Sequence, residues 1–400
     1  MRNPKILLCC SSAPHFGLLS HMTAWARKMK RMGMNVAAVS GPNEQDPGLL
    51  RSLRDEEIDC HLIDGLDDRF PYRLCRTRSQ VKKVVASVKP DVIHTMVMGH
   101  SIDFHLACKK ADWKAKMICT LESCRHGASY EGLARRTIAR LADHICDYLV
   151  VISKIDERKM LRAGARRDKL VYIPNFIDCD DFLKKIDTYR DSPEVRRHFI
   201  KGSPTIVYLA QMVKRKGHIY LFKALEIVRQ HYPDVVLLLF GVGEHEHELR
   251  YRAKVMALTD CVRFMGSVPH DCVPAILSKC DISVISSLSE TFGWTIIEPI
   301  LAGTPVVSTR VGIAPQVEEA GGLLGVPTRD AGSMAGSILK LLRDDNLKRA
   351  LLKRGADYVR EQFDVEAVTK RYGELYGGPS ASCADKADAM EKYAPLQCSS

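Results

Sequence analysis

The feature that most constrains this chain is an alternation of short apolar runs with longer amphipathic stretches. In its first half the apolar runs are KILLCCSS, NVAAVSG, DCHLID, DVIHTMV, KMICTLES and YLVVIS. Such runs are typical of buried strands, and the stretches between them have helical periodicity. Strands that alternate with helices form a parallel sheet covered on both faces. We therefore predict an α/β fold whose ligands bind beyond the carboxyl ends of the strands.

The second half repeats the pattern with TIVYLA, VVLLLFGVG, CVRFMGSVP, DISVISS and PVVST. A chain of 400 residues is long enough for two such domains, each with a full core. The predicted boundaries are an N-terminal domain at 1–178, a polar linker at 179–202, a second domain at 203–363, a last helix at 364–376 and a tail at 377–400. We expect the tail to be disordered because small and polar residues dominate it.

Composition points to a cytoplasmic protein. The apolar run near the N-terminus is shorter than the hydrophobic region of a signal peptide and fits a first strand better. Other apolar runs, such as VVLLLF, are far too short to span a bilayer. Many of the fourteen cysteines lie inside strand-like runs, where a free thiol behaves as a small apolar group. We expect reduced cysteines and no metal site.

One stretch, residues 289–299 (SETFGWTIIEP), carries the chemistry. Gly293 favours a tight loop, and a helix is expected to begin near Thr295. A helix N-terminus offers N–H groups and partial positive charge to a phosphate. Glu290 and Glu298 add two carboxylates, which accept hydrogen bonds from hydroxyl groups. This combination fits a nucleotide sugar, although two solvated or capping glutamates remain the simpler alternative.

A second phosphate site is indicated by the loop QMVKRKG, which follows the strand TIVYLA. Lys214, Arg215 and Lys216 crowd this loop just before a predicted helix. Lysine supplies a point charge for a pyrophosphate, and arginine can bind one through two hydrogen bonds. A solvated basic turn is the alternative.

Residues 289–299 resemble the Glu-x7-Glu motif of glycosyltransferase family 4, whose members are retaining enzymes with the GT-B fold. The resemblance covers about residues 5–376 and implies two facing Rossmann-like domains with the active site between them. It implies that Glu290 faces the donor sugar as a catalytic residue, that Glu298 holds the ribose and that Lys216 contacts a donor phosphate. The donor-binding residues implied are Gln211, Arg215, Lys216, Gly243, Val268, Glu290, Thr291, Phe292, Gly293, Trp294, Thr295 and Glu298.

The chain departs from the family pattern in places. Gln211 stands where the family usually has an arginine, so Arg215 or Lys214 is expected to compensate. Glu122 stands where members often have a histidine near the reacting centre, and His126 follows four residues later. We take Glu122 and His126 as the two candidates for acceptor activation. Gly17 matches a glycine-containing loop that the family places at the cleft.

The resemblance implies transfer of a sugar from a nucleoside diphosphate sugar to a hydroxyl of a glycan or glycolipid, with retention of anomeric configuration. Neither a metal nor another cofactor is expected, and cell-surface polysaccharide biosynthesis is the expected setting for this hexosyltransferase. Two alternatives stay open. One is a sugar-nucleotide epimerase on the same fold, and the other is a catalytically weak protein that binds nucleotide sugars.

Positive charge is concentrated in the first half. Residues 1–178 hold 30 Lys and Arg against 20 Asp and Glu, a net charge of +10, and the remainder holds 29 against 28, a net charge of +1. Such asymmetry indicates an anionic partner. We expect anionic lipid headgroups or a phosphorylated acceptor rather than nucleic acid. The basic residues proposed for this contact are Lys109, Lys110, Lys114, Lys116, Arg135, Arg136 and Arg140.

Overall fold

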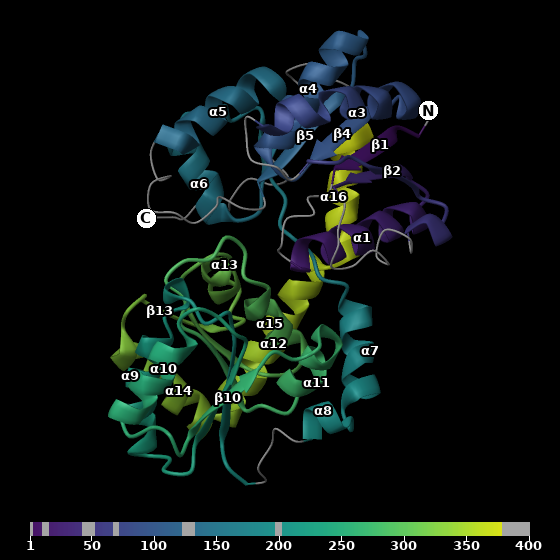
Figure 1. The fold of residues 1–400 in the computed structure, drawn as a ribbon. Helices are drawn as coiled ribbons and strands as arrows, with labels where there is room; N and C mark the ends of the chain where they lie inside the picture. The colour runs from purple at the N-terminus through teal and green to yellow at the C-terminus, as the bar shows by residue number, and fades with distance from the viewer. Residues whose placement is uncertain are drawn as a thin grey trace. The chain divides into compact units, whose positions relative to one another are not determined.

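The computed structural model describes residues 3–9, 16–41, 53–66, 72–121, 133–196 and 202–377. The chain divides into two compact units (Figure 1). The first comprises residues up to Ile152, Asp156–Ile173 and the chain from Thr369 onward. The second comprises Ser153–Ile155 and Pro174–Val368. Both are parallel α/β structures, which confirms the predicted fold class.

In the described part of the first unit, seven strands form one parallel sheet in the order β3-β2-β1-β4-β5-β6-β7. The strands are β1 (Lys5–Cys9), β2 (Asn35–Ser40), β3 (Asp59–Leu62), β4 (Val92–Thr95), β5 (Lys116–Leu121), β6 (Tyr148–Val151) and β7 (Leu170–Tyr172). The helices are α1 (Phe16–Arg31), α3 (Tyr72–Val88), α4 (Met98–Ala111), α5 (Leu133–Ile145), α6 (Lys154–Arg162) and α16 (Val365–Gly377).

The first unit buries apolar residues on its strands, as expected for a parallel sheet. One core cluster joins β1, β2 and β4 to α3 and α4, and another joins β5 and β6 to α5 and α6. Met22, Trp25 and Met29 of α1 are also buried, and their spacing places them on one face of the helix. Cys9 and Cys119 are buried free thiols.

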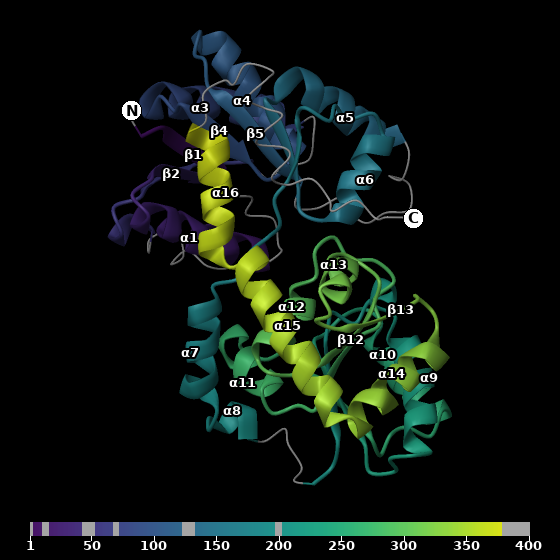
Figure 2. The ribbon, with the colours of Figure 1, turned by 180° about the vertical axis from the view of Figure 1, so that it is seen from behind.

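Helix α16 is held in the first unit by a buried polar network that the sequence did not reveal. His94 of β4 accepts or donates a hydrogen bond at each ring nitrogen, with Tyr376 Oη at 2.6 Å and Thr120 Oγ1 at 2.7 Å. Tyr372 Oη lies 3.0 Å from the same Thr120 hydroxyl, and Trp25 Nε1 of α1 donates to Thr369 Oγ1. Figure 2 shows α16 in yellow beside α1 and β4. The segment predicted to return to the first domain is this helix.

The second unit contains a six-stranded parallel sheet in its described residues, in the order β10-β9-β8-β11-β12-β13. The strands are β8 (Thr205–Leu209), β9 (Val236–Phe240), β10 (Val262–Gly266), β11 (Ile282–Ile285), β12 (Val306–Thr309) and β13 (Leu324–Val326). The helices are α7 (Cys179–Tyr189), α8 (Pro193–Arg196), α9 (His218–Arg229), α10 (Glu246–Val255), α11 (Val273–Leu277), α12 (Trp294–Leu301), α13 (Ala314–Glu319), α14 (Ala331–Arg343) and α15 (Asp345–Phe363). Two short 3-10 helices are η2 (Lys214–Lys216) and η3 (His270–Cys272).

Helices cover both faces of the second sheet. Figure 1 shows α9, α10 and α14 on one side and α11 and α12 on the other. The strand order reverses between β8 and β11, because the chain runs outward from β8 to β9 and β10 before it returns to β11. In open parallel sheets, ligands bind beyond the carboxyl ends of the strands at such a reversal. The loops that follow β8 and β11 therefore mark the expected site.

The structure differs from the sequence-based expectations at two places. Residues 179–202 were expected to form a linker, yet α7 and α8 occupy most of this segment and α7 packs against α11. Asp178 caps α7 by accepting a hydrogen bond from the backbone N–H of Asp181. Lys116 was counted among the basic surface residues, but its ammonium donates to the carbonyls of Leu375 and Tyr376 at the end of α16.

The predicted tail at 377–400 lies, apart from Gly377, outside the described residues. Among the helices that the structure describes, none combines the length and apolar character needed to cross a bilayer.

Candidate functional site

The site lies where the sheet topology predicts it, at the carboxyl ends of β8 and β11. After β8 the chain passes through Gln211 into η2, which carries Lys214, Arg215 and Lys216. After β11 it continues through Ser286 and Ser287 to Glu290 and then into α12. Because β8 and β11 are paired neighbours, the two loops lie side by side. The backbone N–H of Leu288 donates to the carbonyl of Arg215 at 2.7 Å and joins them directly.

Lys216 and Glu290 form an ion pair at the centre of this site. Lys216 Nζ lies 2.5 Å from Glu290 Oε1, and Arg215 Nη1 lies 3.6 Å from Glu290 Oε2. The side chains of Lys216 and Glu290 are only 11% and 8% exposed, whereas that of Arg215 is 33% exposed. Burial lowers the pKa of Lys216, and the Glu290 carboxylate partly offsets this effect. One carboxylate thus pairs with two cations that the sequence predicted for a phosphate, and the three groups keep a net charge of +1.

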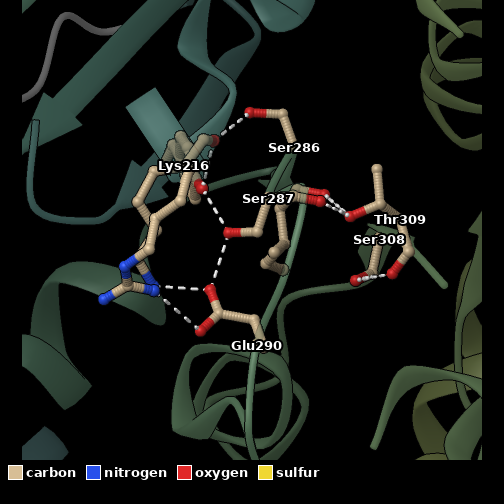
Figure 3. A network of polar contacts seen from close by, with 9 residues as sticks. Lys216, Ser286, Ser287, Glu290, Ser308 and Thr309 are labelled. Carbon is tan, nitrogen blue, oxygen red and sulfur yellow. Dashed lines mark hydrogen bonds and ion pairs between the residues drawn. The ribbon is translucent and has the colours of Figure 1, made fainter. Parts of the chain in front are cut away.

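Buried hydroxyl groups form hydrogen bonds to both partners of this ion pair (Figure 3). Ser287 Oγ donates to Glu290 Oε1 at 2.6 Å and lies 2.9 Å from Tyr208 Oη. Tyr208 Oη and Ser286 Oγ both donate to the backbone carbonyl of Lys216, at 2.8 and 3.0 Å. Thr309 of β12 in turn donates to the carbonyl of Ser287 at 2.6 Å. The cation and the carboxylate are therefore attached to one network that crosses three strands.

Glu298 lies one turn into α12 and is buried. Burial raises the pKa of its carboxyl to about 7. Its Oε1 is 3.9 Å from Nε2 of His270, the first residue of η3. The His270 side chain is 81% exposed. The ionised carboxylate is the stronger acceptor for a pair of hydroxyls, whereas the protonated form uses one oxygen as an O–H donor.

Glycines bring the loops close enough to form the site. Gly293 has φ +101° and precedes α12, as its place in the sequence predicted. Gly312 has φ +55°, and a Cβ there would lie 2.1 Å from the carbonyl oxygen of Phe292. A Cβ on Gly243 would lie 2.5 Å from the carbonyl oxygen of Met212, so only glycine allows the loops after β8 and β9 to meet.

The remaining donor-binding residues predicted in this unit are at the same edge of the sheet. Phe292 is buried, while Thr291, Trp294 and Thr295 are half-buried at the start of α12. Gln211 is exposed in the loop after β8, and Val268 is half-buried in the loop after β10.

Three further predicted residues belong to the first half of the chain. Glu122 and His126 lie outside the described residues. Gly17 is the second residue of α1 in the first unit.

Sequence reasoning missed Tyr208, Ser286, Ser287 and His270. Tyr208 lies inside an apolar strand, and Ser286 and Ser287 follow the neighbouring strand, so all three resemble ordinary strand residues. Their position could have indicated a role, because they lie at or just beyond the carboxyl ends of the two strands at the reversal of strand order. His270 carries no comparable signal because its closeness to Glu298 depends on how η3 packs.

Comparisons with known proteins agree with the fold. A family model described as Glycosyl transferases group 1 matches residues 171–358, and one described as Glycosyltransferase Family 4 matches residues 17–181. The N-acetyl-alpha-D-glucosaminyl L-malate synthase of Bacillus anthracis is 26% identical over 318 residues, which are 76% of this chain and 79% of the relative. A GDP-mannose-dependent alpha-(1-6)-phosphatidylinositol monomannoside mannosyltransferase of Mycobacterium tuberculosis is 26% identical over 269 residues, 64% and 68% of the two chains.

Solved structures show the same architecture. The crystal structure of Anabaena HepE in complex with UDP and glucose superposes with a TM-score of 0.76 at 18% identity, covering 94% of this chain and 100% of that one. WaaG, a glycosyltransferase involved in lipopolysaccharide biosynthesis, superposes with a TM-score of 0.66 at 13% identity, with coverage of 94% and 100%. The fold is GT-B. With the two family models spanning residues 17–358 between them, the chain belongs to glycosyltransferase family 4.

Proposed function

We propose that this protein transfers a hexose from a nucleoside diphosphate sugar to a hydroxyl of a glycan or glycolipid, with retention of anomeric configuration. The observation that carries the proposal is the ion pair of Lys216 with Glu290 at the reversal of strand order. Lys216, a cation for the diphosphate, is hydrogen-bonded to Glu290, a carboxylate for sugar hydroxyls. Glu298, which lies one turn into α12, supplies a second carboxylate for the ribose.

The leaving diphosphate is stabilised in this proposal by the protein's own cations. Lys216 and Arg215 stand beside the loop that leads into the N-terminus of α12. Preorganised positive charge at the position where negative charge develops is an effective form of transition-state stabilisation. We therefore propose transfer without a metal ion or other cofactor, and undiminished activity in the presence of a chelator would support it.

The donor and the reaction are tested in two steps. A panel of UDP-, GDP-, ADP- and dTDP-sugars is screened by thermal shift, because a ligand that binds the folded state raises its apparent stability. The stabilising donor is then incubated with and without glycan or glycolipid acceptors. Transfer only in the presence of an acceptor supports the proposal. A new nucleotide sugar without acceptor would indicate an epimerase, and binding without any turnover would indicate a binding protein.

Acceptor activation is assigned to either Glu122 or His126. A general base typically contributes about 10²- to 10⁴-fold, so the two alanine variants should separate clearly in turnover. Full activity in both variants would leave the donor phosphate itself as the base.

The acceptor is proposed to lie at an anionic membrane or to carry phosphate itself. Lys109, Lys110 and Lys114 are exposed at and after the end of α4, and Arg136 and Arg140 are exposed on α5. Each basic residue near an anionic membrane contributes about 1 kcal/mol, so several together give reversible binding. Sedimentation with anionic liposomes that is lost at high salt would support this contact. Absence of binding at low salt, with full activity on an uncharged soluble acceptor, would refute it.

A further inference from the structure

We infer that the Glu290 carboxylate is an internal counter-anion of the site, which pairs with Lys216 and Arg215 until a diphosphate takes these cations from it. The carboxylate released in this exchange is then available to accept hydrogen bonds from the donor sugar. The inference rests on the proposed function for the identity of the ligand. It adds that anion binding and sugar binding are coupled through one side chain.

The contacts of the Glu290 carboxylate support this inference. Glu290 uses both carboxylate oxygens on cations, Oε1 on Lys216 at 2.5 Å and Oε2 toward Arg215 at 3.6 Å. Oε1 also accepts the hydrogen bond from Ser287. Lys216 and Ser287 together occupy both lone pairs of Oε1, whereas Oε2 keeps acceptor capacity beside Arg215. Glu290 can therefore accept a sugar hydroxyl at Oε1 only after it releases Lys216.

The physical reason for the pairing is burial. The Lys216 side chain is only 11% exposed, and a nearly buried ammonium without a partner costs several kcal/mol. Arg215 places a second positive charge on the same carboxylate, so an empty site without Glu290 would hold two unneutralised cations. A diphosphate offers more charge and more oxygens than one carboxylate and can satisfy both. Its apparent affinity is reduced by the free energy needed to separate Glu290 from the cations.

Ser287 is a positioning residue in this exchange. Its hydroxyl lies between Tyr208 Oη and Glu290 Oε1, at 2.9 and 2.6 Å. Tyr208 has one proton and two nearby acceptors, the Lys216 carbonyl and Ser287 Oγ. Ser286 also donates to that carbonyl, so the carbonyl keeps a donor if Tyr208 turns toward Ser287. This arrangement can hold Glu290 in place after Lys216 has moved to the ligand.

The test is calorimetric titration of the full chain with UDP, GDP and inorganic pyrophosphate. Glu290→Gln keeps the shape and the acceptor oxygen but removes the competing charge. It should bind pyrophosphate and the recognised nucleoside diphosphate roughly three- to thirtyfold more tightly than the wild type, although it transfers sugar more slowly. Ser287→Ala should lower turnover about tenfold with diphosphate affinity unchanged or slightly higher. General destabilisation cannot produce these opposite changes.

The titrations are run at about pH 6, because removing Glu290 from the buried Lys216 lowers the lysine pKa further. The other charged or titratable groups around Lys216 are Arg215 and His218. Burial lowers the pKa of His218 to about 4, so this ring stays neutral at the chosen pH.

Asp260→Asn is the matched control. It removes the carboxylate of a single ion pair, with Arg229, before the amino end of β10. Its diphosphate affinity should equal that of the wild type. A Glu290→Gln variant with equal or weaker affinity than the wild type would overturn the inference while leaving the proposed function intact. Failure of every variant and of the wild type to bind any of the three probes would overturn both.

Discussion

Trp294 Nε1 donates a hydrogen bond to the backbone carbonyl of Phe176, at 3.1 Å and across 118 residues of sequence. Trp294 is the first residue of α12, and Phe176 lies just before α7. Phe176 is buried. Its backbone carbonyl anchors the start of the helix that carries Glu298. The contact joins the turn before α7 to the segment between β11 and α12.

The stability of the protein should depend on the ionisation of Glu298. Its pKa is raised from 4.5 to about 7 in the folded chain, so between these values the folded state retains a proton that the unfolded chain has lost. Stability contributed by this group is therefore present at low pH and is lost as pH rises toward and past 7. At about pH 8 Glu298→Gln should be more stable than the wild type by on the order of 1–3 kcal/mol. Urea unfolding at acid and alkaline pH checks this, and an equal difference at both would contradict it.

Nucleotide binding should show the opposite pH dependence. An ionised carboxylate accepts hydrogen bonds from the ribose hydroxyls more strongly than a protonated one, so affinity of the wild type for the nucleoside diphosphate should rise as pH increases through about 7. Glu298→Gln should bind roughly 10- to 100-fold more weakly above that pH and lose most of the rise. Calorimetric titrations across this pH range measure the affinities of the wild type and of the variant. A variant that keeps the wild-type pH profile would assign the ionisation to another group.

Lys216→Ala should weaken binding of the free nucleoside diphosphate as well as the donor, because both carry the diphosphate. A charge-assisted hydrogen bond contributes about 1.5–3 kcal/mol, which corresponds to roughly 10- to 100-fold in affinity. Lys223→Ala is the control, since Lys223 is an exposed lysine of α9 outside this loop. If calorimetry gave wild-type affinity for Lys216→Ala, the phosphate contact would pass to Arg215 or Lys214.

Gly312→Ala and Gly303→Ala should differ sharply in their effects. Both glycines have positive φ, at +55° and +83°, so alanine strains either backbone by about 1 kcal/mol. At Gly303 nothing lies within 4 Å of the added Cβ, whereas at Gly312 the carbonyl oxygen of Phe292 lies 2.1 Å away. Gly312→Ala should therefore displace the loop that carries Glu290 and weaken nucleotide binding. Thermal unfolding measures the stability of both variants, and calorimetric titration measures their nucleotide affinities. Equal nucleotide affinities would argue against the predicted loop shift.

Acid should destabilise the first unit through His94. Burial lowers its pKa from 6.5 to about 3, so the folded ring stays neutral while the unfolded chain takes up a proton below about 6.5. Stability attributable to this group is therefore lost as pH falls from about 6.5 toward 3.

Replacing a partner of His94 tests the same network. Tyr376→Phe leaves Nδ1 without its hydroxyl and should cost about 1–3 kcal/mol at neutral pH. Tyr372→Phe, whose hydroxyl contacts Thr120 rather than the ring nitrogens, should cost less. Urea unfolding of both variants measures the difference, and equal losses would show that the hydrogen bond to His94 contributes no more than the one to Thr120.

The sequence by itself determined the local features of this protein. The buried strands, the helix that starts beside Gly293 and the residues of the Glu290–Glu298 segment all follow from short-range patterns. Apolar periodicity reflects which side of an element is buried, and a glycine at a positive φ reflects local sterics. These properties depend on a few neighbouring residues, so they can be recognised before any fold is known.

The tertiary structure decided which side chains meet. Lys216 and Glu290 are 74 residues apart, and they pair because β11 lies next to β8 rather than next to β10. His94 and Tyr376 meet across 282 residues for a similar reason, since α16 returns to the first sheet. Lys116 resembled a surface charge in the sequence, yet it binds the end of that helix. Whether a charged residue serves a ligand, a partner side chain or a helix terminus depends on strand order and helix packing, which act over distances that no local pattern records.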